Sequence, residues 1–334
     1  VQGIRRADLR VRPPNSFQSL LLAPSPWSRG RALFTNGEVT YCFDRSDLPD
    51  RPDRSDCFDR PVRPDLKSGR TKKRFERRKT MKCLILAAGY ATRLYPLTKD
   101  TPKPLLEVAG KSILERLLDK IRLIDKIDHV YVVTNARFAN AFEEWVGEYT
   151  YTKKLTVIDD GTTSNDNRLG AIGDIQYVID QVGLSDDLMI LAGDNLFDFD
   201  LRDFEQFFQE KSADVITAYE VADIDLARRI GIVELDSEAR ILSFEEKPQQ
   251  PKSRWGVPAL YIYKQETLPL VKKYLDEGNN PDAPGHFVPW LIKNKPVYAF
   301  QFQGQWHDIG TIESYEEAQT VFARNEVEIA SSKE

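Results

Sequence analysis

The sequence predicts an α/β protein built on a doubly wound, mostly parallel sheet whose later strands become mixed. Three observations support this fold class. Short, continuous apolar runs of the kind found in buried parallel strands recur along the chain. Segments with helical spacing of apolar residues alternate with these runs, and polar or charged motifs directly follow several of them. Repeated βαβ units with a ligand-binding edge at the strand ends account for all three.

The first half of the body begins with the run KCLILA at residues 82–87, which suits a buried parallel strand. Ser112 and Glu115 form a capping box, behind which apolar residues keep helical spacing as far as Ile124. Further strands are predicted at 130–134, 155–158 and 188–192, with helices at about 138–148 and 171–182 between them.

The second half of the body is richer in strands. A helix opens at Leu201, and β-rich stretches follow at 215–221 and at 231–246, the latter bent at 236–239. The remaining predicted elements are a strand at 256–263, a helix near 266–276, a strand at 297–302 and a closing helix at about 312–324. We expect the folded domain to cover residues 81–334.

Residues 1–80 differ from this body in composition. They carry 19 Lys and Arg against 10 Asp and Glu, and a crude repeat of Asp, Arg, Ser and Pro between 41 and 63 cannot build a core. We expect a low-complexity basic leader that is disordered or is not translated in the native protein. The latter interpretation rests on Glu76-Arg77-Arg78, which a ribosome-binding sequence just before the codon for Met81 can encode. A basic interaction arm is the alternative.

The composition of the body excludes several classes of protein. Residues 81–334 hold 28 Lys and Arg against 42 Asp and Glu, which argues against nucleic acid as a partner. The sequence has no apolar run of about 18 residues and no signal-peptide core, so we expect a cytoplasmic protein without a membrane partner. The cysteines form no CxxC pair or zinc spacing, and Cys83 is expected to be a buried thiol.

The strongest chemical signal is the loop that follows the first strand. It reads Ala88-Gly89-Tyr90-Ala91-Thr92-Arg93, and Lys103 follows between two prolines. Small residues let backbone N–H groups approach a phosphate, and the two cations neutralise oligophosphate charge. The loop is neither a GxGxxG fingerprint nor a P-loop, which disfavours hydride transfer and P-loop hydrolysis. An ordinary βα turn with two solvated cations is the structural alternative.

Two acidic residues are candidate metal ligands. Asp194 follows an apolar strand at the ligand-binding edge of the predicted sheet, and Asp308 precedes the closing helix. Magnesium commonly binds one or two carboxylates together with phosphate oxygens and water. Taken alone, an aspartate at a strand end such as Asp194 is more often a helix cap or turn former, and Asp308 can equally be read as a turn residue.

A carboxylate and an ammonium stand side by side at Glu246-Lys247, at the end of an alternating strand. Glu246 could accept hydrogen bonds from sugar hydroxyls while Lys247 holds a phosphate as a point charge. A solvated pair at a sheet edge is the alternative.

Together these stretches resemble the sugar-1-phosphate nucleotidylyltransferase family, of the glucose-1-phosphate thymidylyltransferase and uridylyltransferase type. That family shares an L-A-G-G-x-G-T-R-L loop, then P-K-P, G-D, E-K-P and W-x-D-x-G-T, and their order and spacing fit residues 81–325. The resemblance implies a Rossmann-like fold in a single catalytic domain, with Mg²⁺ as cofactor. It also implies that a sugar 1-phosphate attacks the α-phosphorus of a nucleoside triphosphate, which gives an NDP-sugar and pyrophosphate.

The resemblance also implies roles for individual residues. The loop Ala88, Gly89, Tyr90, Ala91, Thr92 and Arg93 together with Lys103 would bind triphosphate, Asp194 and Asp308 the metal, Gly231, Glu246 and Lys247 the sugar phosphate, and Gly170 with Ala171 the base. Arg93, Lys103 and Lys247 would stabilise the charge on the five-coordinate phosphorus. The attacking phosphate has a second pKa of about 6, so no general base is required.

The loop departs from the family pattern, because Tyr90 and Ala91 replace x and Gly and are expected to narrow the base or phosphate pocket. Between Asp159 and Asp174, the place of the family's base-reading segment is taken by Thr163, Asn165, Arg168, Leu169, Gly170 and Ala171. The match is loose, so the sequence does not identify the base or the sugar. Two rival functions remain open: a cytidylyltransferase acting on a non-sugar phosphate such as phosphocholine, and a catalytically silent nucleotide-sugar-binding regulatory subunit. A homo-oligomer is also left open.

Overall fold

The computed structural model describes residues 31–35, 38–42 and 80–331, and its side chains from residue 80 to residue 324. The chain divides into two units, Val1–Lys73 and Arg74–Glu334. In the first unit the described residues form an antiparallel hairpin of β1 (Arg31–Thr35) and β2 (Glu38–Cys42). The expected leader lies mostly outside the described residues, and the domain boundary at Met81 stays a prediction.

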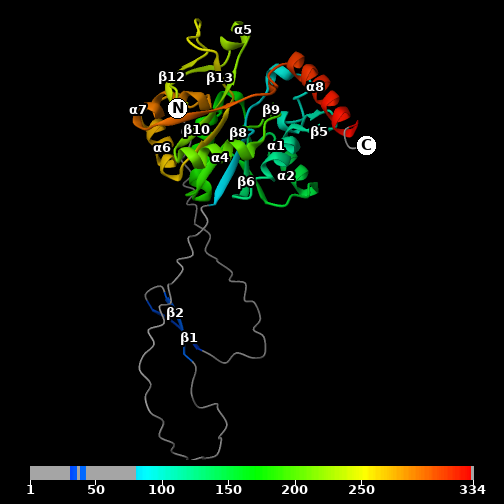
Figure 1. Cartoon of the computed structure of the whole chain (residues 1–334). Helices are drawn as coiled ribbons and strands as arrows, with labels where there is room; N and C mark the ends of the chain where they lie inside the picture. The colour runs from blue at the N-terminus through cyan, green and yellow to red at the C-terminus, as the bar shows by residue number, and fades with distance from the viewer. Residues whose placement is uncertain (1–30, 36–37, 43–79, 332–334) are drawn as a thin grey trace, which may run out of the picture. The chain divides into compact units, whose positions relative to one another are not determined.

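The second unit contains a mixed ten-stranded sheet (Figure 1). Its order is β12-β11-β13-β10-β14-β8-β3-β6-β7, with β15 paired to β10. The strands are β3 (Met81–Leu86), β6 (Ile127–Thr134), β7 (Lys154–Asp159), β8 (Asp187–Ala192), β10 (Asp214–Glu220), β11 (Gly231–Leu235), β12 (Ile241–Glu246), β13 (Trp255–Val257), β14 (Leu260–Tyr263) and β15 (Val297–Phe302). Within this sheet β12, β13 and β14 run against the other strands. The predicted mixed, mostly parallel α/β fold is therefore confirmed.

The strand order reverses between β3 and β8. The chain passes from β3 outward to β6 and β7, then returns to place β8 on the other side of β3. A reversal of this kind leaves a crevice at the carboxyl ends of the two central strands, where ligands bind in open α/β sheets. The loop after Leu86 and the turn after Ala192 both start at that crevice.

Helices cover both faces of the sheet. One face packs against α1 (Ile113–Ile121), α2 (Ala139–Glu148) and α4 (Leu201–Lys211). The other face packs against α3 (Ala171–Val182), α6 (Leu268–Asp276) and α7 (Phe287–Asn294). The short α5 (Ile224–Ala227) and the long α8 (Ile312–Ser331) complete the helices of the body. The result is a three-layer α/β/α arrangement.

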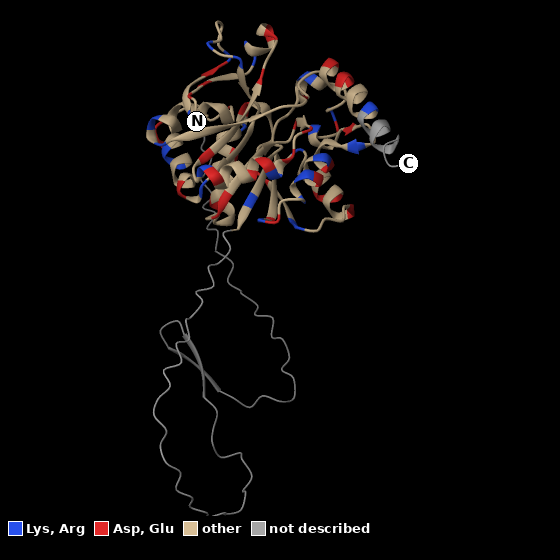
Figure 2. Cartoon of the chain, in the orientation of Figure 1, with Lys and Arg blue, Asp and Glu red and all other residues tan. Residues whose placement is uncertain are grey.

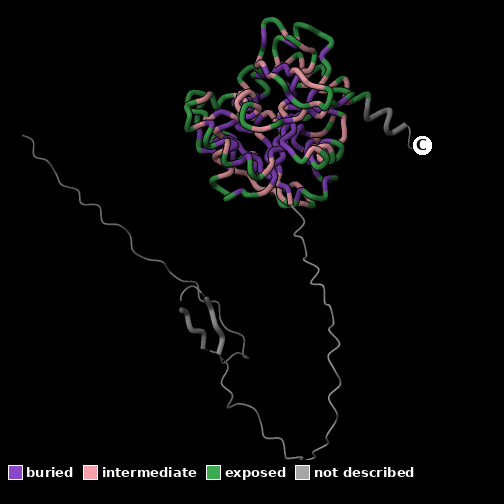
Figure 3. Tube along the Cα trace, turned by 60° about the vertical axis from the view of Figure 1, so that its left-hand side comes forward, coloured by how far each residue is buried: buried purple, intermediate pink, exposed green. Residues whose placement is uncertain are grey.

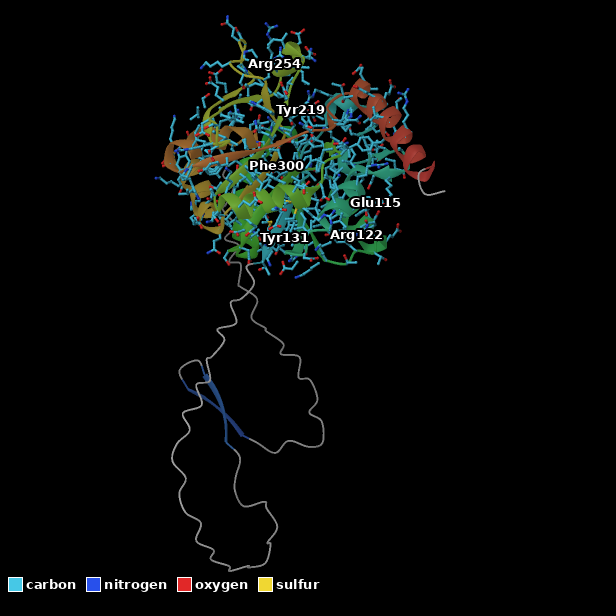
Figure 4. The ribbon with its side chains drawn as sticks, in the orientation of Figure 1. Glu115, Arg122, Tyr131, Tyr219, Arg254 and Phe300 are labelled. Atoms are coloured by element: carbon cyan, nitrogen blue, oxygen red, sulfur yellow. The ribbon has the colours of Figure 1, made fainter. Side chains whose placement is uncertain are left out.

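Strand alternation divides the core between these two faces, and Figure 3 shows the buried chain at the centre of the body. On β3, Leu84 faces the first cluster of buried side chains while Cys83 and Ile85 face the second, and all three are fully buried. Cys83 is thus a buried thiol, as expected. Phe300 of β15, labelled in Figure 4, packs against Phe204 and Phe207 of α4.

Several elements were not predicted. Helix α7 contains Pro289, and α5 has a single turn, so neither carries a clear helical pattern. The short strands β4 (Glu107–Val108), β5 (Lys111–Ser112), β9 (Asn195–Phe197) and β16 (Trp306–Asp308) are also new. The predicted strand at 256–263 is two strands, β13 and β14, since the chain turns at Pro258.

The surface carries charges of both signs, and Figure 2 shows acidic and basic residues interspersed over the helices and strands of the body. Among the described helices, none combines the length and the apolar character that crossing a membrane requires.

Candidate active site at the carboxyl edge of the sheet

The loop after β3 presents a row of free backbone donors. Within the described residues, none of the N–H groups of residues 88–93 donates to a protein acceptor; bonding resumes with Leu94 N–H, which donates to Ala91 O at 3.0 Å. Ala91 takes a left-handed conformation, with φ of 46°, which turns the chain into a short 3₁₀ segment. Consecutive unbonded N–H groups at such a turn form an anion-binding concavity.

Asp194, at the exit of β8, lies at the centre of a polar network. Lys103 Nζ donates to Asp194 Oδ2 at 2.7 Å, and Asn195 Nδ2 donates to Asp194 Oδ1 at 2.7 Å. Trp306 Nε1 in turn donates to Asn195 Oδ1 at 2.6 Å. Burial acts to raise the pKa of Asp194, but the Lys103 charge and these hydrogen bonds outweigh it and lower the pKa. Asp194 is therefore held ionised and oriented.

Asp308 is brought beside Asp194 by the pairing of β9 with β16. Asp308 stands opposite Asn195 in that pair, and Ile309 N–H donates to Asp194 O at 3.0 Å. Desolvation and the neighbouring Asp194 carboxylate raise the pKa of Asp308 to about 6, although Lys103, Arg93 and Lys247 act in the opposite sense. Two carboxylates that repel each other at the mouth of a cavity form a suitable place for a divalent cation.

This pair is the extent of the acidic site. The described residues contain no group of three or more His, Cys, Asp or Glu side chains that could hold a metal ion. The donor set still fits magnesium, because Mg²⁺ commonly takes one or two carboxylates and completes its shell with substrate phosphates and water.

A cavity of about 430 Å³ opens beside the carboxylates, and Arg93, Asp194, Lys247 and Asp308 are among its lining residues. Glu246, the last residue of β12, also lines it. A Cβ at Gly231 would lie 2.5 Å from the Phe244 ring and 3.2 Å from Glu246 Oε2, and a Cβ at Gly285 would lie 2.9 Å from the same oxygen. A side chain at either glycine would therefore fill the space next to the Glu246 carboxylate.

Lys247 follows in a left-handed conformation, with φ of 49°, and its N–H donates to Ile230 O at 3.1 Å. The kink leaves an exposed ammonium 3.7 Å from Glu246 Oε1 at the cavity wall. Arg229 also lines this cavity.

A second cavity of about 300 Å³ lies between the loop after β3 and the start of α3. Its lining includes Ala88, Gly89, Gly170 and Ala171, together with the acidic residues Asp160 and Asp174. Gly170 has φ of +80°, and a Cβ there would lie 2.6 Å from Pro281 O. Ala171 N–H and Ile172 N–H donate to Asp282 O and Pro281 O at 2.9 Å, so these first-turn donors are already satisfied. The two cavities share Leu86, Ala171 and Asp282.

The predicted site residues thus lie at one edge of the sheet, but two of them, Lys103 and Tyr90, do not line the cavities. Lys103 binds Asp194 and does not line either cavity. Tyr90 is buried, with its hydroxyl 3.3 Å from Thr162 Oγ1, and it too lines neither cavity. Its position does not support the expected narrowing of the pocket by the Tyr90 ring.

Sequence reasoning missed several lining residues. Arg229, Asn195 and Gly285 carry no motif of their own, whereas Asp160 and Asp174 belong to the stretch 159–174 whose match to the base-reading segment is loose. Asn195 directly follows Asp194 and Arg229 stands two residues before Gly231, so their nearness to predicted site residues was the only signal that could have found them.

Comparison with known proteins places this site in context. A UTP–glucose-1-phosphate uridylyltransferase of Synechocystis sp. is 27% identical over 248 residues, which cover 71% of this chain and 62% of that protein. A glucose-1-phosphate adenylyltransferase of Fusobacterium nucleatum is 29% identical over 275 residues, which cover 72% of this chain and 66% of that protein. The chain spans between about half and two thirds of the length of the curated relatives it matches.

Solved structures agree on the fold. A UDP-glucose pyrophosphorylase in complex with UDP-glucose matches with a TM-score of 0.63 at 20% identity, covering 74% of this chain and 99% of that one. The family model described as "Nucleotidyl transferase" matches residues 82–325. The match covers the three-layer body and every predicted site residue, and the chain accordingly belongs to the nucleotidyl transferase family.

Proposed function

We propose that this protein is a sugar-1-phosphate nucleotidylyltransferase that converts a nucleoside triphosphate and a sugar 1-phosphate to an NDP-sugar and pyrophosphate. One observation carries the proposal. The unbonded N–H groups of residues 88–93 and the carboxylates Asp194 and Asp308 lie at the switch point of the sheet. The Glu246 cavity lies beside them, and a second cavity shares three of its lining residues. The relatives named above, which bear the names of such transferases, support the same reaction.

The chemistry follows from this arrangement. A phosphate oxygen of the sugar 1-phosphate attacks the α-phosphorus, and the bond from that phosphorus to the bridging oxygen of the β-phosphate breaks. Pyrophosphate leaves in line and takes the electron pair with it. The attacking phosphate has a second pKa of about 6 and needs no general base at neutral pH.

The protein's contribution is alignment and charge. The loop N–H groups would hold the triphosphate, with Arg93 at the cavity wall to neutralise developing charge. Lys247 would hold the sugar phosphate, and Glu246 would accept hydrogen bonds from sugar hydroxyls, in space kept open by Gly231 and Gly285. Lys103 supports this site through Asp194, whose carboxylate it fixes.

Magnesium is the cofactor we propose, with Asp194 and Asp308 as its protein ligands. The ion, when bound, would neutralise phosphate charge next to the α-phosphorus. It would also relieve the repulsion by Asp194 that adds to desolvation in raising the pKa of Asp308.

The decisive experiment is a matrix of ATP, CTP, GTP, UTP and dTTP against several sugar 1-phosphates and phosphocholine, with Mg²⁺ or EDTA, read by pyrophosphate release. We expect Mg²⁺-dependent release with at least one sugar 1-phosphate. Release with phosphocholine alone would favour the cytidylyltransferase alternative. Binding of nucleotide-sugars with no release in any combination would favour the silent regulatory subunit.

We propose a cytoplasmic location and small-molecule substrates as the partners, with no nucleic acid or membrane surface. The acidic balance of residues 81–334 supports the exclusion of nucleic acid. The homo-oligomeric state stays open and is measurable by analytical ultracentrifugation.

A further inference from the structure

Two residues beside the proposed metal ligands have no role in the reaction described above. Asn195 follows Asp194 directly, and Trp306 opens β16, two residues before Asp308. Asn195 is 4% exposed, and Trp306 lines the cavity of about 430 Å³. Neither side chain carries a charge or a nucleophile. Any contribution that they make to the reaction would therefore act through the groups that they contact.

The hydrogen bonds of this pair run in one direction. Trp306 Nε1 donates to Asn195 Oδ1 at 2.6 Å, and Asn195 Nδ2 donates to Asp194 Oδ1 at 2.7 Å. An indole N–H can only donate, so it holds the oxygen of the Asn195 amide on its own side. The NH₂ group of the same amide is then turned toward Asp194, whose carboxylate can only accept. Without the indole donor, the amide would be free to rotate and present its oxygen to the carboxylate, which would repel it.

The other oxygen of Asp194 is held by a second donor. Lys103 Nζ donates to Asp194 Oδ2 at 2.7 Å, so each carboxylate oxygen already accepts one hydrogen bond. A carboxylate has about four lone-pair sites, which leaves about two for a cation or water. Donors on both oxygens fix the rotation of the carboxylate about its Cβ–Cγ bond. The remaining lone pairs of Asp194 therefore point in a fixed direction.

Strand β16 supplies both the second carboxylate and the donor that starts this chain of hydrogen bonds. In the pair of β9 and β16, Asp308 stands opposite Asn195. Residues two apart on a strand project from the same face, and both Trp306 and Asp308 line the cavity that Asp194 also lines. Ile309 N–H adds a backbone hydrogen bond to Asp194 O at 3.0 Å. A shift of β16 would therefore disturb both carboxylates at once.

We infer that Trp306 and Asn195 are positioning residues, which set the orientation of Asp194 relative to Asp308 and so raise the affinity of the two carboxylates for a divalent cation. Trp306 acts through Asn195, because the only donor of its side chain is used there. Loss of such partners around metal ligands typically costs about 10- to 100-fold in metal affinity or activity. The inference rests on the proposed function, because it assumes that Asp194 and Asp308 hold Mg²⁺.

The test measures binding of Mn²⁺ alone to the full chain by electron paramagnetic resonance, for the wild type, Trp306→Phe, Asn195→Ala and the double variant. Phenylalanine keeps an aromatic ring near Tyr219, whose ring centroid lies 6.3 Å from that of Trp306, and removes the indole donor. We expect the Kd for Mn²⁺ to rise by about 10-fold or more in Asn195→Ala and by about 3- to 10-fold in Trp306→Phe. The double variant should match Asn195→Ala within about twofold, because the loss of one link already breaks the chain.

Trp290→Phe is the matched control. Trp290 Nε1 also donates to a side chain, Glu277 Oε2, at 2.7 Å, but Trp290 lies on α7 and lines neither cavity of the site. Its loss should leave the Kd for Mn²⁺ unchanged. Nuclear magnetic resonance of the indole N–H groups supplies a readout without metal. The peak that disappears in Trp306→Phe should move upfield in Asn195→Ala, where the acceptor of that N–H is lost.

Two results would overturn the inference and leave the transferase intact. One is a Kd for Mn²⁺ in Trp306→Phe within about twofold of the wild type, as in the control. The other is a double variant that binds more weakly than Asn195→Ala by the whole Trp306→Phe factor, since independent effects multiply. Should Asn195→Ala fail to fold, the comparison of Trp306→Phe with Trp290→Phe still decides.

The Mg²⁺ concentration for half-maximal pyrophosphate release is measured on the same variants. It decides by the same ratios if Mn²⁺ binds the wild type only in the presence of nucleotide. Pyrophosphate release that EDTA does not reduce overturns the inference alone. Absence of both Mn²⁺ binding and pyrophosphate release in the wild type overturns the proposed function and the inference together.

Discussion

At the scale of single residues, the structure gives Lys103 a role that its sequence motif does not indicate, which is to bind Asp194. A lysine between two prolines near a phosphate loop suggests direct contact with triphosphate, but its ammonium lies 2.7 Å from Asp194 Oδ2 and is largely buried. Removing such a cation leaves Asp194 uncompensated in a half-buried position, which affects the proposed metal site first. Lys103 is thus better described as a positioning residue.

Asp194 itself provides the most direct test at this scale. Asp194→Asn should lower kcat by roughly 10²- to 10³-fold, because it removes a charge placed at the proposed metal and phosphate site. The measurement is pyrophosphate release with saturating substrates, with the fold verified by circular dichroism. Asp128→Asn is the control, since Asp128 pairs with Lys82 at 2.6 Å near the start of β6 and lines neither cavity. An Asp194→Asn variant within twofold of wild type would refute the assignment.

A second prediction concerns the pH dependence of stability at Asp174. In the unfolded chain an aspartate has a pKa of about 3.9, whereas in the fold burial and the neighbouring Asp160 carboxyl raise the pKa of Asp174 to about 8. Between these values the folded state holds a proton that the unfolded state releases, so the free energy of unfolding falls as the pH rises. The Asp174→Asn variant has no carboxyl group here and does not lose stability in this way as the pH rises. The difference between its melting temperature and that of the wild type should therefore grow by roughly 3 °C or more between pH 5 and pH 8.

Thermal melts of both proteins at several pH values measure this effect. A gap that stays constant or narrows with rising pH would contradict the pKa assigned to Asp174.

At the scale of elements, the start of α3 is fixed by the loop at 281–282. The amide groups of Ala171 and Ile172 donate to that loop, and Gly170 lies against Pro281 O with a positive φ. These contacts join α3 to the segment that leads to Gly285 and the Glu246 cavity. A change at Gly170 should therefore affect both cavities.

Gly170→Ala should destabilise the protein by roughly 2 kcal/mol or more and weaken nucleotide binding, because the new Cβ would collide with backbone 2.6 Å away. Gly183→Ala is a matched control at the other end of the same helix. Gly183 also has positive φ, at +60°, but no atom lies within 4 Å of the position that a Cβ would take there, so only backbone strain of about 1 kcal/mol is expected. Chemical denaturation measures both, and equal losses would show that the contact with Pro281 is unimportant.

Helices and strands with a clear local sequence pattern were predicted correctly. The apolar run at 82–87 and the cap at Ser112, whose hydroxyl accepts from Glu115 N–H at 3.1 Å, both behave as their sequences indicate. Helix α7 and strands β9 and β16 could not be predicted in this way. Their residues adopt these conformations through contacts with distant segments, such as the pairing of Asp308 with Asn195.

At the scale of the whole molecule, a buried ionic cluster ties three distant segments together. Asp214, fully buried at the start of β10, accepts hydrogen bonds from Lys264 N–H and Thr267 Oγ1 and pairs with Lys295 Nζ at 3.0 Å. Burial raises the pKa of Asp214, and these partners act against that rise. The cluster lies where β10, β15 and the segment before α6 begin, at the edge opposite the site.

Lys295→Met should lower the melting temperature by roughly 6 to 20 °C, since removing one partner of a buried pair costs about 3–5 kcal/mol. Lys272→Met is the control, because Lys272 pairs with Asp276 on an exposed helix surface, with both side chains more than 60% exposed. Its effect should stay below about 3 °C. Comparable shifts in the two variants would show that the buried cluster adds little to the fold.

The sequence by itself determined the α/β class, the order of most strands and helices, and the motifs that identify the family. These features depend on local periodicity and on residue types at fixed spacing, which a linear chain displays directly. Only the tertiary structure decided that Lys103 holds Asp194, that Gly285 borders Glu246, and that Asp160 and Asp174 are buried next to each other. Each of these contacts joins residues that are far apart in the sequence or that belong to no recognisable motif. The charge state and hydrogen bonding of such residues depend on burial and distance, which are set only when the sheet brings its strand ends together.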